Sequence, residues 1–493
     1  MNNRPPGKVA GRPLAAAAFL LFAMSCGGQT PGQSADAGSD AEAISDVRPD
    51  AQAQADTDAI DYDERLTALL AEAGAAPVAS APAFDEAKVR LGHGLFFDPI
   101  LSGNRDTSCA TCHRMDEGTS VRRALAVGTH FVERDGERFP GPGHSFTPRK
   151  SPPLFNLGDE NTSSLLWDGR VTQNEDGQFV IFDKGWEKSE ENFLRFLPTE
   201  LDNLLAAQTM MPVLSRDELR GDHGEVDIEG NPNELAIVHD QNLEGVWSAL
   251  VDRLMAVEEY RTLFAEAYPQ VAPDEVEFAH ASNALSAFII DAFTLTDSPF
   301  DDYLRGDADA LTEQQKRGAY LFYGEADCAR CHSGALLSDE KLRNIGVRPL
   351  GPGPEVDYDV DMGAIFRTHG GEADKFAFRT PSLRNVELTG PYMHNGVYTT
   401  LEAALRHHLD VRDGLRNYDP SQLDEEFQRY VHNEPELLDS VEETLVDIEA
   451  TTLTDDEVDA LLAFLESLTS PTARELDELE PQTVPSGLPL PDP

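Results

Sequence analysis

The chain has 493 residues, of which 40% are hydrophobic and 26% are charged, so it is long enough for more than one soluble domain with a substantial core. Its 89 Asp and Glu residues outnumber its 39 Lys and Arg residues, which gives a formal net charge of −50 at pH 7. A chain this acidic repels a phosphate backbone, so no nucleic-acid partner is expected. The charge fits attraction of a basic protein partner and equally fits a solvated acidic surface without a partner.

Residues 1–25 have the pattern of an export signal, which is a basic start followed by a short apolar run from Leu14 to Met24. That run is too short to cross a membrane as a helix of the mature protein. Cys26 follows directly and predicts a bacterial lipoprotein with a lipid anchor on this cysteine, with ordinary cleavage nearby as the alternative. Residues 26–61 contain almost no large apolar side chain and are therefore predicted to be a disordered linker.

Apolar residues at helical spacing begin near Tyr62 and predict a first helix there. A second helix is predicted from Ala87 to Phe97, where Pro99 ends it. Further along the chain, helical periodicity is found at 243–267 and at 275–295. The charged and aromatic stretch at 171–200 breaks this pattern and is predicted to be an insertion.

Two CxxCH motifs are the strongest chemical signal in the chain, one at 109–113 (CATCH) and one at 328–332 (CARCH). This pattern attaches a haem through two thioethers, and its histidine is the proximal iron ligand. A single copy would also suit a redox dithiol or part of a zinc site, but two copies contain four of the five cysteines. We therefore predict two covalently bound haem c groups. The predicted attachment and ligand residues are Cys109, Cys112, His113, Cys328, Cys331 and His332.

The region before each motif is also duplicated, because residues 92–97 and 318–323 both read Gly-x-x-Leu-Phe-aromatic. This duplication predicts a mainly α-helical protein of two cytochrome c-like haem domains with long irregular loops. The predicted domains are residues 62–299 and 300–470, followed by an acidic, proline-rich tail at 471–493. An amphipathic helix that begins near residue 455 is expected to pack across the helix before the second motif, as the last helix does in cytochrome c modules.

Several segments resemble, in the same order, the bacterial dihaem cytochrome c peroxidase/MauG family over residues 85–470. These segments are LGHGLFFDPILSGNRDTSCATCH, SPPLFN, LWDGR, CARCH, FRTPSLRNVELTGPYMHNG and LTDDEVDALLAFLESL. The resemblance implies that the haem of the N-terminal domain reacts with peroxide. It also implies that the haem of the C-terminal domain supplies or stores an electron.

The resemblance implies two catalytic residues near the first haem. The family's tryptophan between the haems corresponds to Trp167, for which a core role alone is the alternative. Its catalytic glutamate, which follows a proline by a few residues, corresponds to Glu218 after Pro212, although Leu219 stands where a methionine is usual. A carboxyl beside bound peroxide can move a proton from the near oxygen to the leaving one. A surface glutamate is the alternative for Glu218.

The second iron ligands are less certain from the pattern. His144 lies in the loop where peroxidases of this family carry a histidine that binds the first haem at rest, and an exposed loop residue is the alternative. For the second haem, the resemblance places a Met or Tyr just before the FRTP segment, but residues 374–377 offer no good ligand. Met393 is then the nearest candidate, with a core methionine as the alternative.

The resemblance implies hydrogen peroxide as substrate and a small cytochrome c or copper protein as the periplasmic electron donor. It also allows one calcium ion between the two domains. Two other functions stay open at this point. One is a MauG-like oxidase that acts on a protein or small molecule, and the other is a dihaem electron carrier without catalysis.

Overall fold

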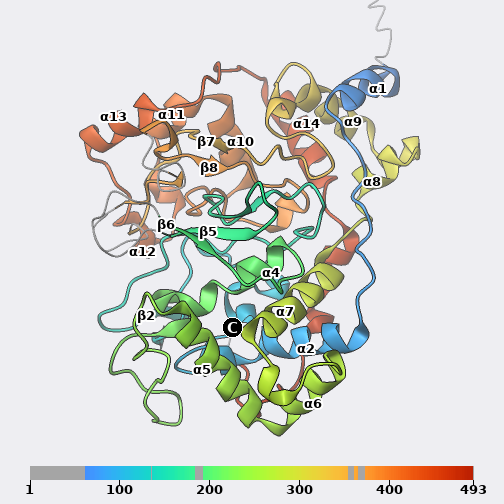
Figure 1. Cartoon of the computed structure of the whole chain (residues 1–493). Coiled ribbons are helices and arrows are strands. Elements are labelled where there is room, and N and C mark those ends of the chain that lie inside the picture. Colours follow the sequence, from blue (N-terminus) through green and yellow to red (C-terminus); the bar gives the residue numbers. More distant parts are fainter. Residues whose placement is uncertain (1–60, 135, 184–192, 353–359, 365–371, 492–493) are drawn as a thin grey trace, which may run out of the picture. The chain divides into compact units, whose positions relative to one another are not determined.

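Two pairs of crossing helices organise the computed structural model (Figure 1). In one pair α2 (Glu86–Phe97) packs across α7 (Phe278–Phe293), and in the other α9 (Glu313–Tyr323) packs across α14 (Asp455–Glu466). The structure describes residues 61–134, 136–183, 193–352, 360–364 and 372–491. The predicted export signal, Cys26 and nearly all of the predicted linker lie outside these ranges.

Ten further helices and short strands connect these four helices in the described part of the chain, and the structure is mainly helical as predicted. The other helices are α1 (Tyr62–Glu72), α3 (Cys109–Cys112), α4 (Leu204–Thr209), α5 (Leu243–Ala256), α6 (Glu258–Ala267), α8 (Pro299–Leu304), α10 (Leu401–Leu409), α11 (Val411–Arg416), α12 (Glu425–Gln428) and α13 (Pro435–Glu443). The strands are β1 (Phe131–Arg134), β2 (Glu137–Pro140), β3 (Ser164–Leu165), β4 (Val171–Gln173), β5 (Phe179–Asp183), β6 (Phe193–Phe196), β7 (Leu342–Arg343) and β8 (Phe378–Arg379). They pair antiparallel in sheets ordered β1-β2, β3-β4-β5-β6 and β7-β8, so part of the predicted insertion at 171–200 is a hairpin.

Each helix crossing depends on a glycine at the point of contact. A Cβ atom on Gly92 of α2 would lie 1.9 Å from the carbonyl oxygen of Ala284 in α7. A Cβ atom on Gly318 of α9 would lie 1.9 Å from the carbonyl oxygen of Ala460 in α14. The duplicated Gly-x-x-Leu-Phe-aromatic segment is therefore the sequence mark of two equivalent crossings.

The Gly318→Ala variant is expected to be less stable than the parent. In an ordinary helix this change stabilises by about 0.5–1 kcal/mol, because glycine is a poor helix former. At Gly318 the added methyl meets backbone, and overpacking of this kind costs about 1–3 kcal/mol. Thermal and denaturant unfolding would show a lowered midpoint, and Gly92→Ala should behave alike. An unchanged or raised midpoint in both variants would contradict this account of the crossings.

Each crossing lies in its own hydrophobic core. In the first core the rings of Phe96 and Phe288 lie 5.3 Å apart, and in the second the rings of Phe322 and Phe464 lie 5.1 Å apart. The prediction that the last helix packs across the helix before the second motif is confirmed. We call residues 61–299 the first half and residues 300–470 the second half. A further cluster, which includes the aromatic pair Phe146 and Phe427, joins the two halves.

The first described helix packs against the second half rather than the first. Leu66 and Leu70 of α1 are buried in the second core. Asp63 also accepts hydrogen bonds from Lys316 Nζ and Tyr303 Oη, both at 2.8 Å. The predicted domain 62–299 therefore includes a helix whose contacts are with the second core. Periodicity shows that a helix has an apolar face, but it does not show which part of the chain that face packs against.

The segment predicted as a tail packs back onto the first half. Leu476 and Val484 are buried in the first core. Ser486 donates from its backbone N–H and its hydroxyl to the Asp98 carboxylate, at 2.9 and 2.7 Å, and Leu479 O lies 2.7 Å from His93 Nε2. Residues 471–491 are thus an ordered part of the first core, and the two ends of the described chain each contact the other half.

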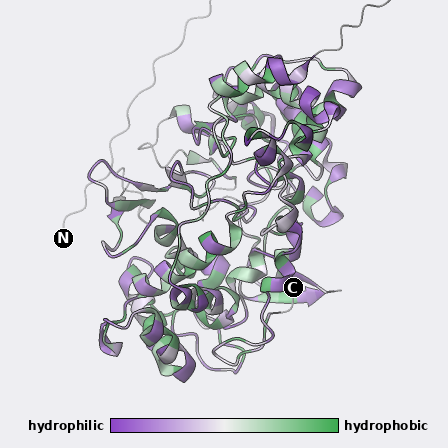
Figure 2. Ribbon diagram, turned by 90° about the vertical axis from the view of Figure 1, so that its right-hand side faces the viewer, coloured by the Kyte–Doolittle hydropathy of each residue, from purple (hydrophilic) through white to green (hydrophobic). Residues whose placement is uncertain are grey.

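The helices have hydrophobic and hydrophilic residues side by side, as amphipathic elements of a water-exposed fold do (Figure 2). Within the described part of the chain, no helix combines the length and the hydropathy that a membrane crossing needs.

Candidate haem and active sites

The cysteines of both CxxCH motifs are free and half-buried. Burial raises the pKa of the Cys109 and Cys328 thiols to about 12, and that of the Cys112 thiol to about 11. Redox-active cysteines have lowered thiol pKa values, so the raised values at Cys109, Cys112 and Cys328 do not suit a redox dithiol.

His113 and His332 are oriented in the same way by one ring nitrogen. Nδ1 of His113 lies 3.0 Å from Thr119 O, and Nδ1 of His332 lies 2.9 Å from Leu337 O. Donation of the Nδ1 proton to these carbonyls leaves each Nε2 lone pair available to a metal ion. Burial lowers the pKa of both imidazoles to about 4, so both are neutral at pH 7, as metal ligands must be. The residues of both motifs therefore fit a covalently bound haem.

Glu218 lies on a π-helical turn, Arg216–Arg220, that packs against the segment after the first motif. Its carbonyl oxygen accepts a hydrogen bond from the Thr129 N–H at 2.9 Å, and a Cβ atom on Gly128 would lie 2.7 Å from Glu218 Cα. Burial is the main cause of the raised pKa of the Cys112 thiol, and the negative charge of Glu218 raises it further. Glu218 therefore lies beside the first haem-attachment motif, although the two are far apart in the chain.

The Glu218 carboxyl is accessible to solvent and still strongly desolvated by the protein around it. Desolvation raises its pKa from 4.5 to about 7, and Asp217 adds to the rise, whereas Arg170 and Arg149 oppose it. The side chain is exposed, as in the surface-glutamate alternative, but its raised pKa sets it apart from an ordinary surface carboxyl. With a pKa near 7 it can accept a proton and return it at neutral pH.

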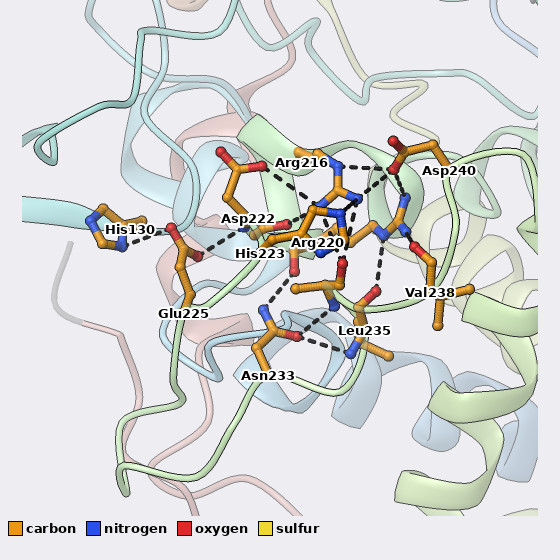
Figure 3. Close-up of polar contacts among 12 residues, drawn as sticks. His130, Arg216, Arg220, Asp222, His223, Glu225, Asn233, Leu235, Val238 and Asp240 are labelled. Atoms are coloured by element: carbon orange, nitrogen blue, oxygen red, sulfur yellow. Dashed lines mark hydrogen bonds and ion pairs between the residues drawn. The ribbon is translucent and has the colours of Figure 1, made fainter. Parts of the chain in front are cut away.

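Two arginines fix the turn that carries Glu218 (Figure 3). Arg216 Nη2 and Arg220 Nη1 both contact Asp240 Oδ1, at 2.5 and 2.8 Å. Arg220 is only 2% exposed, and its carbonyl oxygen accepts a hydrogen bond from Asn233 Nδ2 at 2.8 Å. The backbone on both sides of Glu218 is therefore held in place, which preorganises the carboxyl.

Trp167 lies at the seam, where residues 149–168 of the first half meet residues 361–394 of the second. Its indole Nε1 donates to Lys150 O at 2.8 Å, and its carbonyl oxygen accepts from the Arg379 N–H at 2.7 Å. Lys150 in turn donates from its N–H to His394 O at 2.8 Å. Trp167 is thus hydrogen-bonded to both halves, which is more than a role in one core requires.

An ion-pair chain also crosses the seam beside Trp167. Arg149 Nη1 lies 2.9 Å from Asp168 in the first half, and Arg149 Nε lies 2.5 Å from Asp361 in the second. Asp168 and Asp361 are buried, and desolvation by itself would raise the pKa of both carboxyls. The charge of the Arg149 guanidinium is among the causes that outweigh this effect and lower both pKa values. Removing one partner would leave a buried charge without its counterion.

His144 is partnered rather than exposed. Its Nε2 lies 2.7 Å from Glu225 Oε1, its ring stacks on His130 with 4.2 Å between ring centres, and its side chain is only 8% exposed. These contacts argue against an exposed loop residue. A role as resting ligand of the first haem, which stays a prediction, would require the Glu225 contact to break.

Met393 packs against the cluster that joins the halves, as a core methionine does. His408, on α10, instead faces His332 with 6.3 Å between ring centres. Two imidazole rings at this separation can bind one metal ion between them, because metal–nitrogen bonds are about 2.0 Å long. His408 Nδ1 lies 2.8 Å from Ala404 O, which again leaves Nε2 for a metal ion.

Comparison with known proteins identifies the relatives of this chain. A family profile described as "Di-haem cytochrome c peroxidase" matches residues 86–309. The solved structure of a MauG-like protein associated with microbial copper homeostasis has 26% sequence identity and a TM-score of 0.50, and covers 81% of this chain and 94% of that chain. Cytochrome c peroxidase Ccp of Escherichia coli is 29% identical over 322 residues, which are 65% of this chain and 53% of that protein.

The methylamine utilization protein MauG of Methylorubrum extorquens is 31% identical over 324 residues, which are 65% of this chain and 68% of that protein. This chain belongs to the dihaem cytochrome c peroxidase/MauG family. Family membership implies two haem c groups, in agreement with the geometry of both CxxCH motifs.

In this member of the dihaem cytochrome c peroxidase/MauG family, His408 follows the PYMHNG segment on a helix that starts after Thr400, whereas the resemblance placed the ligand of the second haem before the FRTP segment. Its neighbour His407 is no competitor, because its two ring nitrogens contact Tyr398 Oη and Ile345 O, both at 2.8 Å. Only the fold distinguishes these adjacent histidines.

The calcium ion between the halves stays a prediction for this dihaem peroxidase homologue. Two cations, the largely buried Arg149 and the buried Lys150, lie at the seam, and burial lowers the pKa of the Lys150 amine to about 7. Among the described residues, three His, Cys, Asp or Glu side chains converge as a possible metal site only at His130, His144 and Glu225, which lie in the first half.

Proposed function

We propose that this protein is a dihaem c-type peroxidase that reduces hydrogen peroxide to water with electrons from a small cytochrome c or copper protein. The observation that carries the proposal is the position of Glu218, a preorganised and desolvated carboxyl beside the first haem-attachment motif. Reduction of one peroxide to two waters consumes two electrons and two protons, so the site must move protons as well as electrons.

A haem held by Cys109, Cys112 and His113 would supply the electron chemistry. Glu218 accepts the proton from the peroxide oxygen nearer to the metal and returns it to the far oxygen, which leaves as water. Arg170, whose charge lowers the pKa of Glu218, limits how strongly the carboxyl holds that proton. The fixed backbone of the turn keeps the carboxyl in place during both transfers.

The second half is proposed to hold the electron-storing haem through Cys328 and Cys331. His332 and His408 would hold its iron, supported by their 6.3 Å ring separation and by the Nδ1 contacts that leave each Nε2 available. A thioether ligand raises a haem potential, so a second imidazole in its place gives a lower potential. Trp167, hydrogen-bonded to both halves, is proposed to lie on the electron route between them.

A MauG-like oxidase is the alternative, favoured by the 31% identity to MauG of Methylorubrum extorquens. Such an enzyme would use the same carboxyl but take electrons from a protein or small-molecule substrate instead of a redox carrier. A dihaem electron carrier without catalysis leaves the desolvated Glu218 carboxyl without a role.

Export to the periplasm is proposed from residues 1–25, with a lipid anchor on Cys26 or ordinary cleavage nearby. Export agrees with the haem motifs, because c-type haems are normally attached outside the cytoplasm. The partner would then be a periplasmic donor, for which the acidic surface favours a basic protein.

The proposed function is tested on protein purified from a host that attaches haem c. Its intact mass is expected to exceed that of the processed polypeptide by two haem groups. With peroxide it is expected to oxidise two reduced donor proteins per peroxide consumed. A mass with one haem or none would contradict the site. A two-haem protein that consumes peroxide only with a non-carrier substrate would favour the MauG-like oxidase, and one that ignores peroxide would favour the carrier.

A further inference from the structure

Three metal-binding side chains converge outside the haem motifs. Glu225 Oε1 lies 2.9 Å from His130 Nδ1 and 2.7 Å from His144 Nε2, and the three ligand atoms all lie within 4.8 Å of one another. The side chains of His144 and Glu225 are 8% and 9% exposed, whereas His130 is more open at 35%. The group is therefore built into the protein with one side turned towards solvent.

The fold brings the two histidines together through a hairpin. His130 directly precedes β1 and His144 follows β2, and these strands pair from Phe131 with Pro140 at the open end of the hairpin. Gly141 N–H donates to His130 O at 2.9 Å and His144 N–H to Gly141 O at 3.0 Å. A Cβ atom on Gly141 would lie 2.3 Å from His130 Cδ2, so only glycine lets the ring occupy this place.

The second oxygen of Glu225 is held in place while the first points towards His130 (Figure 3). Oε2 accepts hydrogen bonds from Asn104 Nδ2 at 2.8 Å and from the Asp222 N–H at 3.1 Å. Oε1 is buried, and within the described ranges no donor reaches it with hydrogen-bond geometry, although both imidazole nitrogens are within 2.9 Å. A buried carboxylate oxygen that makes no hydrogen bond needs an explanation, and an ion shared with the two imidazoles supplies one.

We propose that His130, His144 and Glu225 bind one divalent transition-metal ion. Two imidazole nitrogens and one carboxylate oxygen are a ligand set of zinc sites with an open fourth position, and imidazole also suits copper and nickel. With bonds of about 2.0–2.1 Å, the ligand atoms around a tetrahedral zinc ion lie about 3.3 Å apart. Binding of zinc would therefore lengthen the contacts from Glu225 Oε1 to the two histidine nitrogens by about half an ångström. The contacts of Glu225 Oε2 are the supporting hydrogen bonds that orient such a ligand.

The bound ion would link the hairpin to the segment that carries the candidate catalytic carboxyl. Glu225 follows Glu218 by seven residues, and Thr129, beside His130, donates its N–H to Glu218 O at 2.9 Å. An ion at this site would also occupy His144 Nε2. Metal binding and the predicted binding of His144 to the first haem therefore exclude each other, a consequence that rests on the proposed function.

The test titrates the metal-depleted two-haem protein with Zn²⁺ by calorimetry and then measures zinc and iron by mass spectrometry after dialysis. One zinc per two irons is expected. His130→Ala and Glu225→Gln should each weaken binding at least tenfold, because each removes a ligand. His239→Ala, at an exposed histidine outside the group, should bind like the parent.

Haem content and unfolding midpoint show whether each variant is folded. If His130→Ala loses its haem groups, Glu225→Gln decides the question, because glutamine keeps the shape and can still accept from Asn104. Absence of saturable zinc binding would overturn the proposal, and so would binding that survives both replacements. The calorimetry requires no peroxide, so its outcome is independent of whether the protein is a peroxidase.

Discussion

The Glu218→Gln variant is expected to keep both haem groups and to lose peroxide turnover by about a hundredfold or more. Glutamine preserves the shape and the backbone contacts of Glu218 but removes the group that accepts the proton, and acid–base assistance of this kind contributes about 10²–10⁴-fold. Steady-state turnover against a reduced small cytochrome c measures the loss. Asp217→Asn, a change of the adjacent acid on the same turn, is the matched control and should stay within a few-fold of the parent.

The pH dependence gives a second, independent signature of Glu218. Its pKa of about 7 is set mainly by desolvation, with Asp217 raising it and Arg170 and Arg149 lowering it. The ionised form must accept the proton, so kcat/KM is expected to rise with pH through about 7 and then level off. This inflection should vanish in Glu218→Gln, and turnover within a few-fold of the parent would assign the proton transfer to another group.

Stability should change in the direction opposite to activity. The pKa of Glu218 is raised above its unfolded value of 4.5, so the stability contributed by its protonated form is lost as pH rises from 4.5 through about 7. At pH 8 the folded parent therefore holds an unfavourably desolvated carboxylate that Glu218→Gln lacks. Thermal unfolding at pH 8 is expected to show the variant at least as stable as the parent.

The His408→Ala variant is expected to change the iron of the second haem from two imidazole ligands to one. The low-spin electron paramagnetic resonance signal of a bis-histidine haem should disappear from one of the two irons in the chain. His408→Met should instead raise the potential of that haem by about 0.1 V or more, because a thioether favours the reduced iron and axial ligands tune haem potentials widely.

His407→Ala is the matched control, because His407 precedes His408 on the same helix and both of its ring nitrogens contact other groups. It should leave the signals of both irons unchanged. If Met393→Leu, rather than His408→Ala, alters the second haem, the thioether is its ligand and the assignment of His408 is wrong.

Local features of the fold were predictable because local interactions produce them. The helix Glu313–Tyr323 begins after Thr312, whose side chain accepts from Gln315 N–H as a capping box requires, and this signal is contained in four consecutive residues. Both CxxCH motifs were equally clear, since the attachment chemistry is contained in five consecutive residues. The duplicated glycine is visible as a sequence pattern. The close approach between helices that explains it becomes apparent only when the second helix of each crossing has been placed.

Features that depend on distant pairs were not predictable. His144 and Glu225 lie far apart in the chain, with β3 to β6 and α4 between them, and no spacing in the sequence relates them. His332 and His408 are likewise distant in sequence, and His407 and His408 are indistinguishable until the helix is placed.

The segment 471–491 was predicted as a tail from its acidic and proline-rich composition. Composition does not show that its apolar residues Ala473, Leu476 and Val484 fill the first core, which also contains Leu91 and Leu95 from near the start of the described chain. A core that joins opposite ends of a chain can be recognised only once the chain is folded.

The exchange of the chain ends between the halves has a consequence for biosynthesis. Helix α1 is among the first described residues to leave the ribosome, yet its partner α9 begins only at Glu313, after the whole first half has been made. The first core, in turn, is completed only when Ser486 reaches Asp98. Contacts so far apart in sequence form late, so neither half of the nascent chain can finish folding independently of the other. Cys109, which packs against the first core, thus lies in a core that stays incomplete until the last described residues have been made.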